Sequence, residues 1–204
     1  MNCEKKVGIL GSGSWGTALI KMISENSNEL LWYVRDEDQA KKIIETKRNP
    51  KYLKNLNLNI GKVYISSKIE QIIKKSEIII IAIPSPYIHN TLINFKTILK
   101  NKIIFSGSKG VVPESHLVIS EHLNKFFDIP YQSLGILSGP THAEEIATNK
   151  LSYLTICSKN KNICDFLSKK LTSSYIKTSI SDDIVGIEYA ATLKNIYSIL
   201  VGIS

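Results

Sequence analysis

The chain has 204 residues, of which 43% are hydrophobic and 22% are charged. This length and composition allow a sizeable buried core, so they exclude a disordered protein and fit one domain or one and a half. The formal net charge of +8 raises nucleic acid as a partner. The lysines are scattered, however, and no nucleic-acid-binding motif accompanies them, so we expect a solvated surface and no nucleic acid.

Short apolar runs alternate with helical patterns along the chain. The runs predict strands at 6–10, 30–34, 63–65, 77–83, 102–106, 134–137, 153–157 and 175–177. The patterns predict helices at about 14–25, 37–46, 69–75, 87–99, 114–127, from 142, at 162–171 and from 184. Alternation at this spacing predicts an α/β fold, a doubly wound and mostly parallel sheet of the Rossmann-like kind.

The first expected strand runs into the sequence GSGSWG at residues 11–16, a GxGxxG pattern. Its place between a strand and a helix is typical of dinucleotide binding. Gly11 permits the tight turn, Gly13 lets backbone N–H groups approach a pyrophosphate, and Gly16 allows the helix to pack closely on the strand. A glycine-rich turn without a ligand is the alternative.

The second expected strand ends at Arg35 and Asp36, the place where such folds select their cofactor, roughly 20 residues beyond the glycines. Arg35 is suited to pair with a 2′-phosphate or to stack on adenine, and Asp36 to take a ribose hydroxyl. Because Arg35 lies nearest the strand end, NADP is favoured and NAD stays open. An exposed surface pair of these two residues is the alternative.

Two further strand ends carry polar residues. Lys109 follows the fifth expected strand, where a surface charge and a contact to an anion are equally open. Gly139 and Thr141 follow the sixth at a helix N-terminus, which suits a phosphate or hydroxyl group. A Thr141 helix cap is the alternative. His142 beside it is more simply structural than a base.

The last expected helix is apolar on all sides around Lys194 and Asn195. An ammonium buried there is costly unless it is paired or used, and a nearby cation such as Lys109 would favour its neutral form, as a general acid and base requires. A lysine extending to solvent is the alternative. The helix needs covering by a partner chain, as in a homodimer, or by residues beyond Ser204.

Two remaining features concern the compartment. Glu188 and Lys194 lie inside the apolar stretch 184–203, and charges would each cost about 2.5–3.5 kcal/mol at a bilayer centre, so we predict a buried helix without membrane insertion. The three cysteines show no metal-ligand spacing: Cys3, Cys157 and Cys164. Free thiols, no metal site, no signal peptide and a cytoplasmic protein are therefore expected.

Five segments occur together in a fixed order: GSGSWGTAL, IAIPS, SKG, LSGPTHAEEIA and DDIVGIEYAATLKNIYSILVGI. Across essentially the whole chain they resemble the NAD(P)-dependent glycerol-3-phosphate dehydrogenase family, LSGPT with VGIEYAATLKN being the most specific. The resemblance implies an oxidoreductase that interconverts sn-glycerol 3-phosphate and dihydroxyacetone phosphate and supplies phospholipid synthesis. A related dehydrogenase acting on another small acid, or a non-catalytic NAD(P)-sensing module, is the alternative.

The resemblance also implies roles for single residues. Cofactor contacts are expected from Ser14, Trp15, Arg35, Lys109 and Ala143. Substrate contacts are expected from Lys109, Gly139, Thr141, Lys194 and Asn195, with Lys194 as proton donor and acceptor. The family more often has Gly-Gly at Ala190-Ala191 and an aromatic residue at His142, which would reshape the pocket.

Two regions follow from the resemblance. Residues 1–183 would be the NAD(P)-binding domain, and residues 184–204 the first helix of an all-α substrate domain that is otherwise missing. In the family that domain supplies an Asp and an Arg-Asn pair for the phosphate substrate. The 204 residues are therefore expected to bind the cofactor but to be inactive alone.

Overall fold

The computed structural model describes residues 5–27 and 29–203, and for some residues of the last helix, Asn195 among them, only the backbone. The strands are β1 (Val7–Leu10), β2 (Leu30–Tyr33), β3 (Val63–Ser66), β4 (Ile78–Ile81), β5 (Ile103–Ser106), β6 (Val111–Val112), β7 (Leu117–Val118), β8 (Leu134–Ser138), β9 (Ser152–Ser158) and β10 (Ile176–Ser181). The α-helices are α1 (Ser14–Ser24), α2 (Glu37–Thr46), α3 (Ile69–Lys75), α4 (Ile88–Leu92), α5 (Lys96–Leu99), α6 (Ile119–Phe127), α7 (Ala143–Ala147), α8 (Lys161–Leu171) and α9 (Ile184–Ile203). Cys3 lies outside the described residues.

Eight strands form one sheet in the order β10-β9-β8-β5-β4-β1-β2-β3. All neighbours are parallel except β8 and β9, which pair antiparallel. The chain leaves β1 towards β2 and β3 on one side and returns to β4 and β5 on the other. This reversal of strand order opens a crevice at the carboxyl ends of β1 and β4, where doubly wound sheets bind ligands. The predicted fold class is confirmed.

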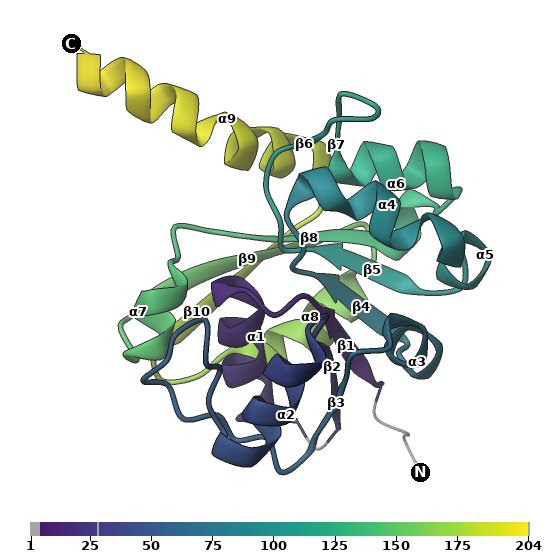
Figure 1. Ribbon diagram of the computed structural model, residues 1–204. Helices are drawn as coiled ribbons and strands as arrows, with labels where there is room; N and C mark the ends of the chain where they lie inside the picture. Colours follow the sequence, from purple (N-terminus) through teal and green to yellow (C-terminus); the bar gives the residue numbers. More distant parts are fainter. Residues whose placement is uncertain (1–4, 28, 204) are drawn as a thin grey trace.

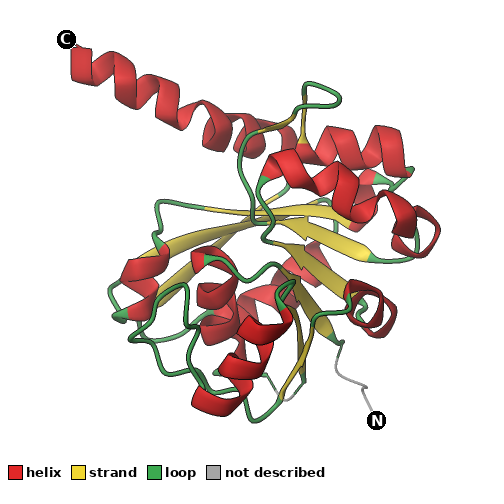
Figure 2. Cartoon of the chain, in the orientation of Figure 1, coloured by secondary structure: helices red, strands yellow, loops and turns green. Residues whose placement is uncertain are grey.

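Helices cover both faces of the sheet (Figure 2), and alternating strand residues contribute to one apolar layer on each face. One layer packs against α1, α2, α7 and α8, and contains Trp32 and Phe105 with no exposed surface. The other packs against α3, α4, α5 and α6. Because the central strand β4 is isoleucine throughout, it is buried on both faces, as its unbroken apolar sequence indicated.

Two expected helices differ from the structure. Residues 111–118 form the β6–β7 hairpin rather than the start of a helix, with Val111 paired to Val118. Pro113 holds the preceding residue extended, and His116 has a left-handed φ of +58°, so the helix begins only at Ile119. The helix expected at 87–99 is broken into α4 and α5, because a 3₁₀ segment separates them.

Helix α9 packs its first turns against β8, β9 and α6, then extends away from the sheet (Figure 1). Ile184 is buried, but several large apolar side chains along the helix are exposed: Val185, Tyr189, Leu193, Tyr197 and Ile199. The expectation of a buried helix is therefore wrong at these described positions. Among the described residues, no helix is long and apolar enough to cross a membrane.

Candidate functional site

The turn after β1 needs two of its three glycines for reasons internal to the chain. Gly11 has a φ of +124°, and a Cβ there would lie 2.4 Å from the carbonyl oxygen of Ala82, which follows β4. A Cβ at Gly16 would lie 2.1 Å from the Gly11 carbonyl oxygen. The first glycine thus permits the turn and the third permits helix α1 to pack against it, as predicted.

Gly13 is different, because nothing in the chain requires a glycine there. Its backbone is extended, with φ −72° and ψ −174°, and a Cβ would meet nothing within 4 Å. The turn therefore faces open space at the N-terminus of an eleven-residue helix. A pyrophosphate fits this place, since helix N-termini favour anions and a missing Cβ lets the backbone approach them.

A cavity of about 300 Å³ lies beside the turn, at the carboxyl ends of β5 and β8. Its lining is Ser14, Trp15, Gly107, Lys109, Leu137, Ser138, Gly139, Thr141, His142 and Ala143. The family resemblance assigns six of these residues to a cofactor or substrate, and the fold brings the lining together from three separate segments: 14–15, 107–109 and 137–143. Within the described chain, the Trp15 Nε1 is a buried donor without a hydrogen-bond partner, so this cavity wall is suited to a ligand that carries an acceptor.

Lys109 is held at the rim of this cavity by the loop that precedes it. The Ser108 hydroxyl donates to the Ile83 carbonyl over 2.7 Å, and the Gly107 N–H donates to the Ile81 carbonyl over 2.9 Å. Lys109 as a whole residue is exposed, but its ammonium group is partly desolvated. This desolvation lowers the pKa of Lys109, and the positive charge of Lys194 lowers it further by a smaller amount. The two positive charges therefore act on each other, which makes this rim attractive to an anion.

Gly139 and Thr141 lie on the opposite wall. A Cβ at Gly139, whose φ is +156°, would lie 2.3 Å from the Tyr153 carbonyl oxygen. The Thr141 hydroxyl donates to the same carbonyl, so its oxygen is left as an acceptor for a ligand hydroxyl rather than as a phosphate donor. Thr141 is also not the helix cap. That position belongs to His142, whose N–H donates to the Glu145 carboxylate over 3.2 Å.

Arg35 and Asp36 have different surroundings at the end of β2. Arg35 is exposed. Asp36 caps α2 by accepting from the Gln39 N–H over 3.1 Å, and it pairs with Lys51. The hydrogen bond from Lys51 is the largest cause that lowers the pKa of Asp36, and the hydrogen bond from the Gln39 N–H is the second. Asp36 is thus engaged within the chain. The partner Lys51 is not evident from the sequence, because no local motif links it to Asp36.

The buried ionisable residue of α9 is Glu188 and not Lys194. Glu188 is 2% exposed, and it accepts from the backbone N–H and the hydroxyl of Ser120 in the first turn of α6. Lys194 is exposed, so the expectation that this chain buries it is wrong. Two residues before Lys194, the Thr192 hydroxyl accepts from the Gly110 N–H over 3.3 Å. The Asn195 side chain lies outside the described structure.

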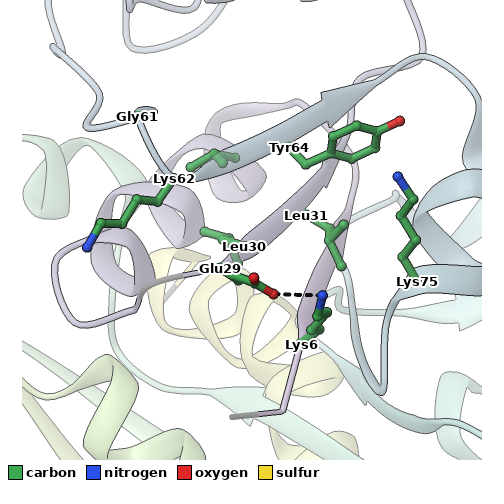
Figure 3. Close-up of a pocket in the computed structure, with 9 residues that line it drawn as sticks. Lys6, Glu29, Leu30, Leu31, Gly61, Lys62, Tyr64 and Lys75 are labelled. Carbon is green, nitrogen blue, oxygen red and sulfur yellow. Dashed lines mark ion pairs between the residues drawn. The ribbon is translucent and has the colours of Figure 1, made fainter. Parts of the chain in front are cut away.

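A second cavity, of about 620 Å³, lies at the amino ends of β1, β2 and β3 (Figure 3). Lys6 and Glu29 form an ion pair of 2.8 Å there, and the Lys75 ammonium lies 3.8 Å from the centre of the Tyr64 ring. Ligands of doubly wound sheets bind at the carboxyl ends instead. This groove is therefore not a candidate for the dinucleotide. Within residues 5–27 and 29–203, no group of three His, Cys, Asp or Glu residues gathers to hold a metal ion.

A doubly wound sheet with a glycine turn at its switch point, beside a cavity with a basic rim, defines a dinucleotide-binding domain. The model of a family described as the N-terminal part of NAD-dependent glycerol-3-phosphate dehydrogenase matches residues 6–164. The chain belongs to this family.

Known relatives agree in sequence and in fold. Glycerol-3-phosphate dehydrogenase [NAD(P)+] of Macrococcus caseolyticus is 33% identical, and the match covers 98% of this chain and 60% of that relative. The protein of the same name from Pseudomonas syringae pv. syringae is 30% identical, and the match covers 100% of this chain and 59% of that relative. The solved glycerol-3-phosphate dehydrogenase of Plasmodium falciparum is 26% identical, with a TM-score of 0.86 over 96% of this chain and 57% of that one. The chain thus spans about 60% of the length of the curated relatives it matches.

Proposed function

We propose that this chain binds NAD(P)(H) and forms the cofactor-binding part of an enzyme that interconverts sn-glycerol 3-phosphate and dihydroxyacetone phosphate. The observation that carries the proposal is the cavity at the carboxyl ends of the strands, which gathers six residues that the family resemblance assigned to cofactor or substrate. The matching relatives bear the same activity in their names, and this supports the substrate.

Each part of the cofactor has a suitable place. The backbone N–H groups of the glycine turn would hold the pyrophosphate, with Ser14 and Trp15 beside it. Arg35 would meet the adenosine end. Since Asp36 is occupied by Gln39 and Lys51, it is less suited to accept a ribose hydroxyl, and this supports NADP over NAD.

The chemistry would take place at the basic rim of the cavity. When bound, the nicotinamide supplies a hydride for the ketone carbon of the substrate. Lys109 would stabilise the negative charge that develops on the substrate oxygen, and Lys194 would deliver the proton. Thr141 would accept a hydrogen bond from a substrate hydroxyl through its free lone pairs. Residues 184–204 would open the substrate domain, whose remainder would cover α9 and complete the phosphate site.

Two other functions fit the fold. A dehydrogenase acting on another small acid would use the same rim, and an NAD(P) sensor would use only the turn. The charge of Lys194 acts on Lys109, and two cations close to one cavity attract an anionic substrate, which favours an enzyme over a sensor that binds only the dinucleotide. A cytoplasmic location, a homodimer and a role in phospholipid synthesis stay predictions.

Two measurements test the proposal. Calorimetry should show that NADPH and NADH bind to the 204-residue chain. A chain extended to the length of its relatives should oxidise NADPH in the presence of dihydroxyacetone phosphate. Binding without turnover in the extended chain would favour the sensor, turnover with a different acid would favour the other dehydrogenase, and no binding at all would overturn the proposal.

A further inference from the structure

The glycine turn is held from behind by side chains of neighbouring elements. The indole N–H of Trp32, in β2, donates to the Gly11 carbonyl over 2.9 Å. The hydroxyl of Thr17, in α1, donates to the Gly13 carbonyl over 2.9 Å. The carbonyl between them, that of Ser12, has no such support from β2 or α1. Its hydrogen bonds come from a more distant part of the sequence.

The shorter of these hydrogen bonds comes from Asn49, in the loop after α2, with no exposed surface. A longer one, of 3.4 Å, comes from the side-chain amide of Gln39 in α2. The Asn49 Nδ2 donates to the Ser12 carbonyl over 3.0 Å and to the Thr17 hydroxyl over 2.8 Å. Its Oδ1 accepts from the Gln39 side chain over 2.9 Å and from the backbone N–H groups of Lys51 and Tyr52. The amide is therefore fully used, and both its position and its orientation are fixed.

A fixed Ser12 carbonyl also fixes the next N–H group. In a planar trans peptide the C=O and the N–H point in opposite directions. Because Asn49 draws the Ser12 oxygen towards the protein, the Gly13 N–H is directed to the other side. On that side a Gly13 Cβ would have met nothing within 4 Å.

We propose that Asn49 is a positioning residue, which orients the Gly13 N–H towards the pyrophosphate of the bound dinucleotide. The proposal rests on the proposed cofactor binding and adds a residue that touches neither cofactor nor substrate. Its cause is electrostatic, since an N–H already aimed at an anion requires no reorganisation when the anion binds. A merely structural Asn49 would stabilise the loop without affecting the affinity of the folded chain.

The test compares Asn49→Ala with wild type by calorimetry, at a temperature where circular dichroism shows both to be folded. NADPH and NADH carry the same pyrophosphate, so we expect both affinities to fall by the same factor, roughly tenfold or more, and their ratio to stay unchanged. If the alanine variant does not fold, Asn49→Ser takes its place. Its side chain is too short to reach the Ser12 carbonyl, so we expect the same loss of affinity.

Asn160→Ala is the matched control. Asn160 also uses its side-chain oxygen within the chain, accepting from the Ile163 N–H over 3.3 Å at the start of α8. It follows β9, which runs antiparallel to β8, and so lies at the end of the sheet away from the turn. This variant should lose stability but keep both affinities. If wild type binds and the folded Asn49 variants bind equally well, the positioning role is overturned. If wild type binds neither cofactor, the proposed function itself fails.

Discussion

Gly13 is the residue at which the turn is open to a ligand. Because its extended backbone suits any residue and its Cβ position is empty, Gly13→Val should leave the chain folded. The added methyl groups would occupy the place proposed for the pyrophosphate, so binding of NADPH and NADH should be abolished. Calorimetry measures the loss and thermal unfolding the stability. Gly61→Val is the control, since Gly61 also has open space at its Cβ but lies in the groove at the amino ends (Figure 3). Equal affinities for Gly13→Val and wild type would sink the assignment of the turn.

Arg35 tests the cofactor preference. A charge-assisted contact to the 2′-phosphate contributes roughly 1.5–3 kcal/mol, so Arg35→Ala should weaken NADPH by about tenfold or more and NADH far less. The control is Lys169→Ala, which removes one positive charge from the exposed surface of α8. Titrations with both cofactors measure the difference. An equal loss for both would mean that Arg35 stacks on adenine, and the preference for NADP would then lose its basis.

Among the elements, α9 is attached to α6 by the hydrogen bonds of Glu188 to Ser120 and by that of Tyr189 to Glu121. Burial is the largest influence on this carboxyl and raises the pKa of Glu188, although the hydrogen bonds from Ser120 oppose the shift. The folded chain therefore holds the proton more tightly than the unfolded chain. The contribution of Glu188 to stability thus falls as pH rises from the unfolded pKa of about 4.3 through the raised folded pKa.

Glu188→Gln, which cannot ionise, should be free of this loss. Its melting temperature relative to wild type should increase as the pH is raised from about 4 through the raised pKa of Glu188. Circular dichroism during heating measures the difference. Glu45→Gln, at an exposed position of α2, should show no comparable trend. A difference between Glu188→Gln and wild type that does not change with pH would contradict the assignment.

At the scale of the whole molecule, the role proposed for Lys194 requires the substrate domain proposed to follow α9. Its test accordingly needs a chain of the length of the relatives. Lys194→Ala should keep the cofactor affinity and lower the rate of dihydroxyacetone phosphate reduction by roughly 10²–10⁴, the usual contribution of a general acid. Lys109→Ala should weaken substrate binding as well as rate, because its contact is electrostatic. Steady-state kinetics against pH distinguishes the two. Near-normal turnover of Lys194→Ala would make His142, which also lines the cavity, the next candidate for the acid.

Local features were predictable wherever the signal itself is local. The helix at Glu37–Thr46 was expected with the boundaries that it has, because its period and its capping Asp36 lie in adjacent residues. The strand ends that carry Gly11, Lys109 and Gly139 were expected for the same reason. These ends meet in one place because parallel strands bring their carboxyl ends to the same edge of the sheet. The hairpin at 111–118 was missed, since its turn depends on a left-handed His116 that composition does not reveal.

The sequence alone determined the α/β class and the glycine turn, because periodicity and motif spacing are properties of neighbouring residues. With the family resemblance it also named six of the ten residues that line the cavity. Tertiary structure alone decided which charges are buried. An all-apolar helix has no preferred face, so only the packing of α6 against α9 selects Glu188 for burial and leaves Lys194 exposed. Likewise, only the fold brings Asn49 behind the turn, across 37 residues of sequence. Burial and hydrogen bonding between distant segments depend on contacts in space, and no local pattern encodes them.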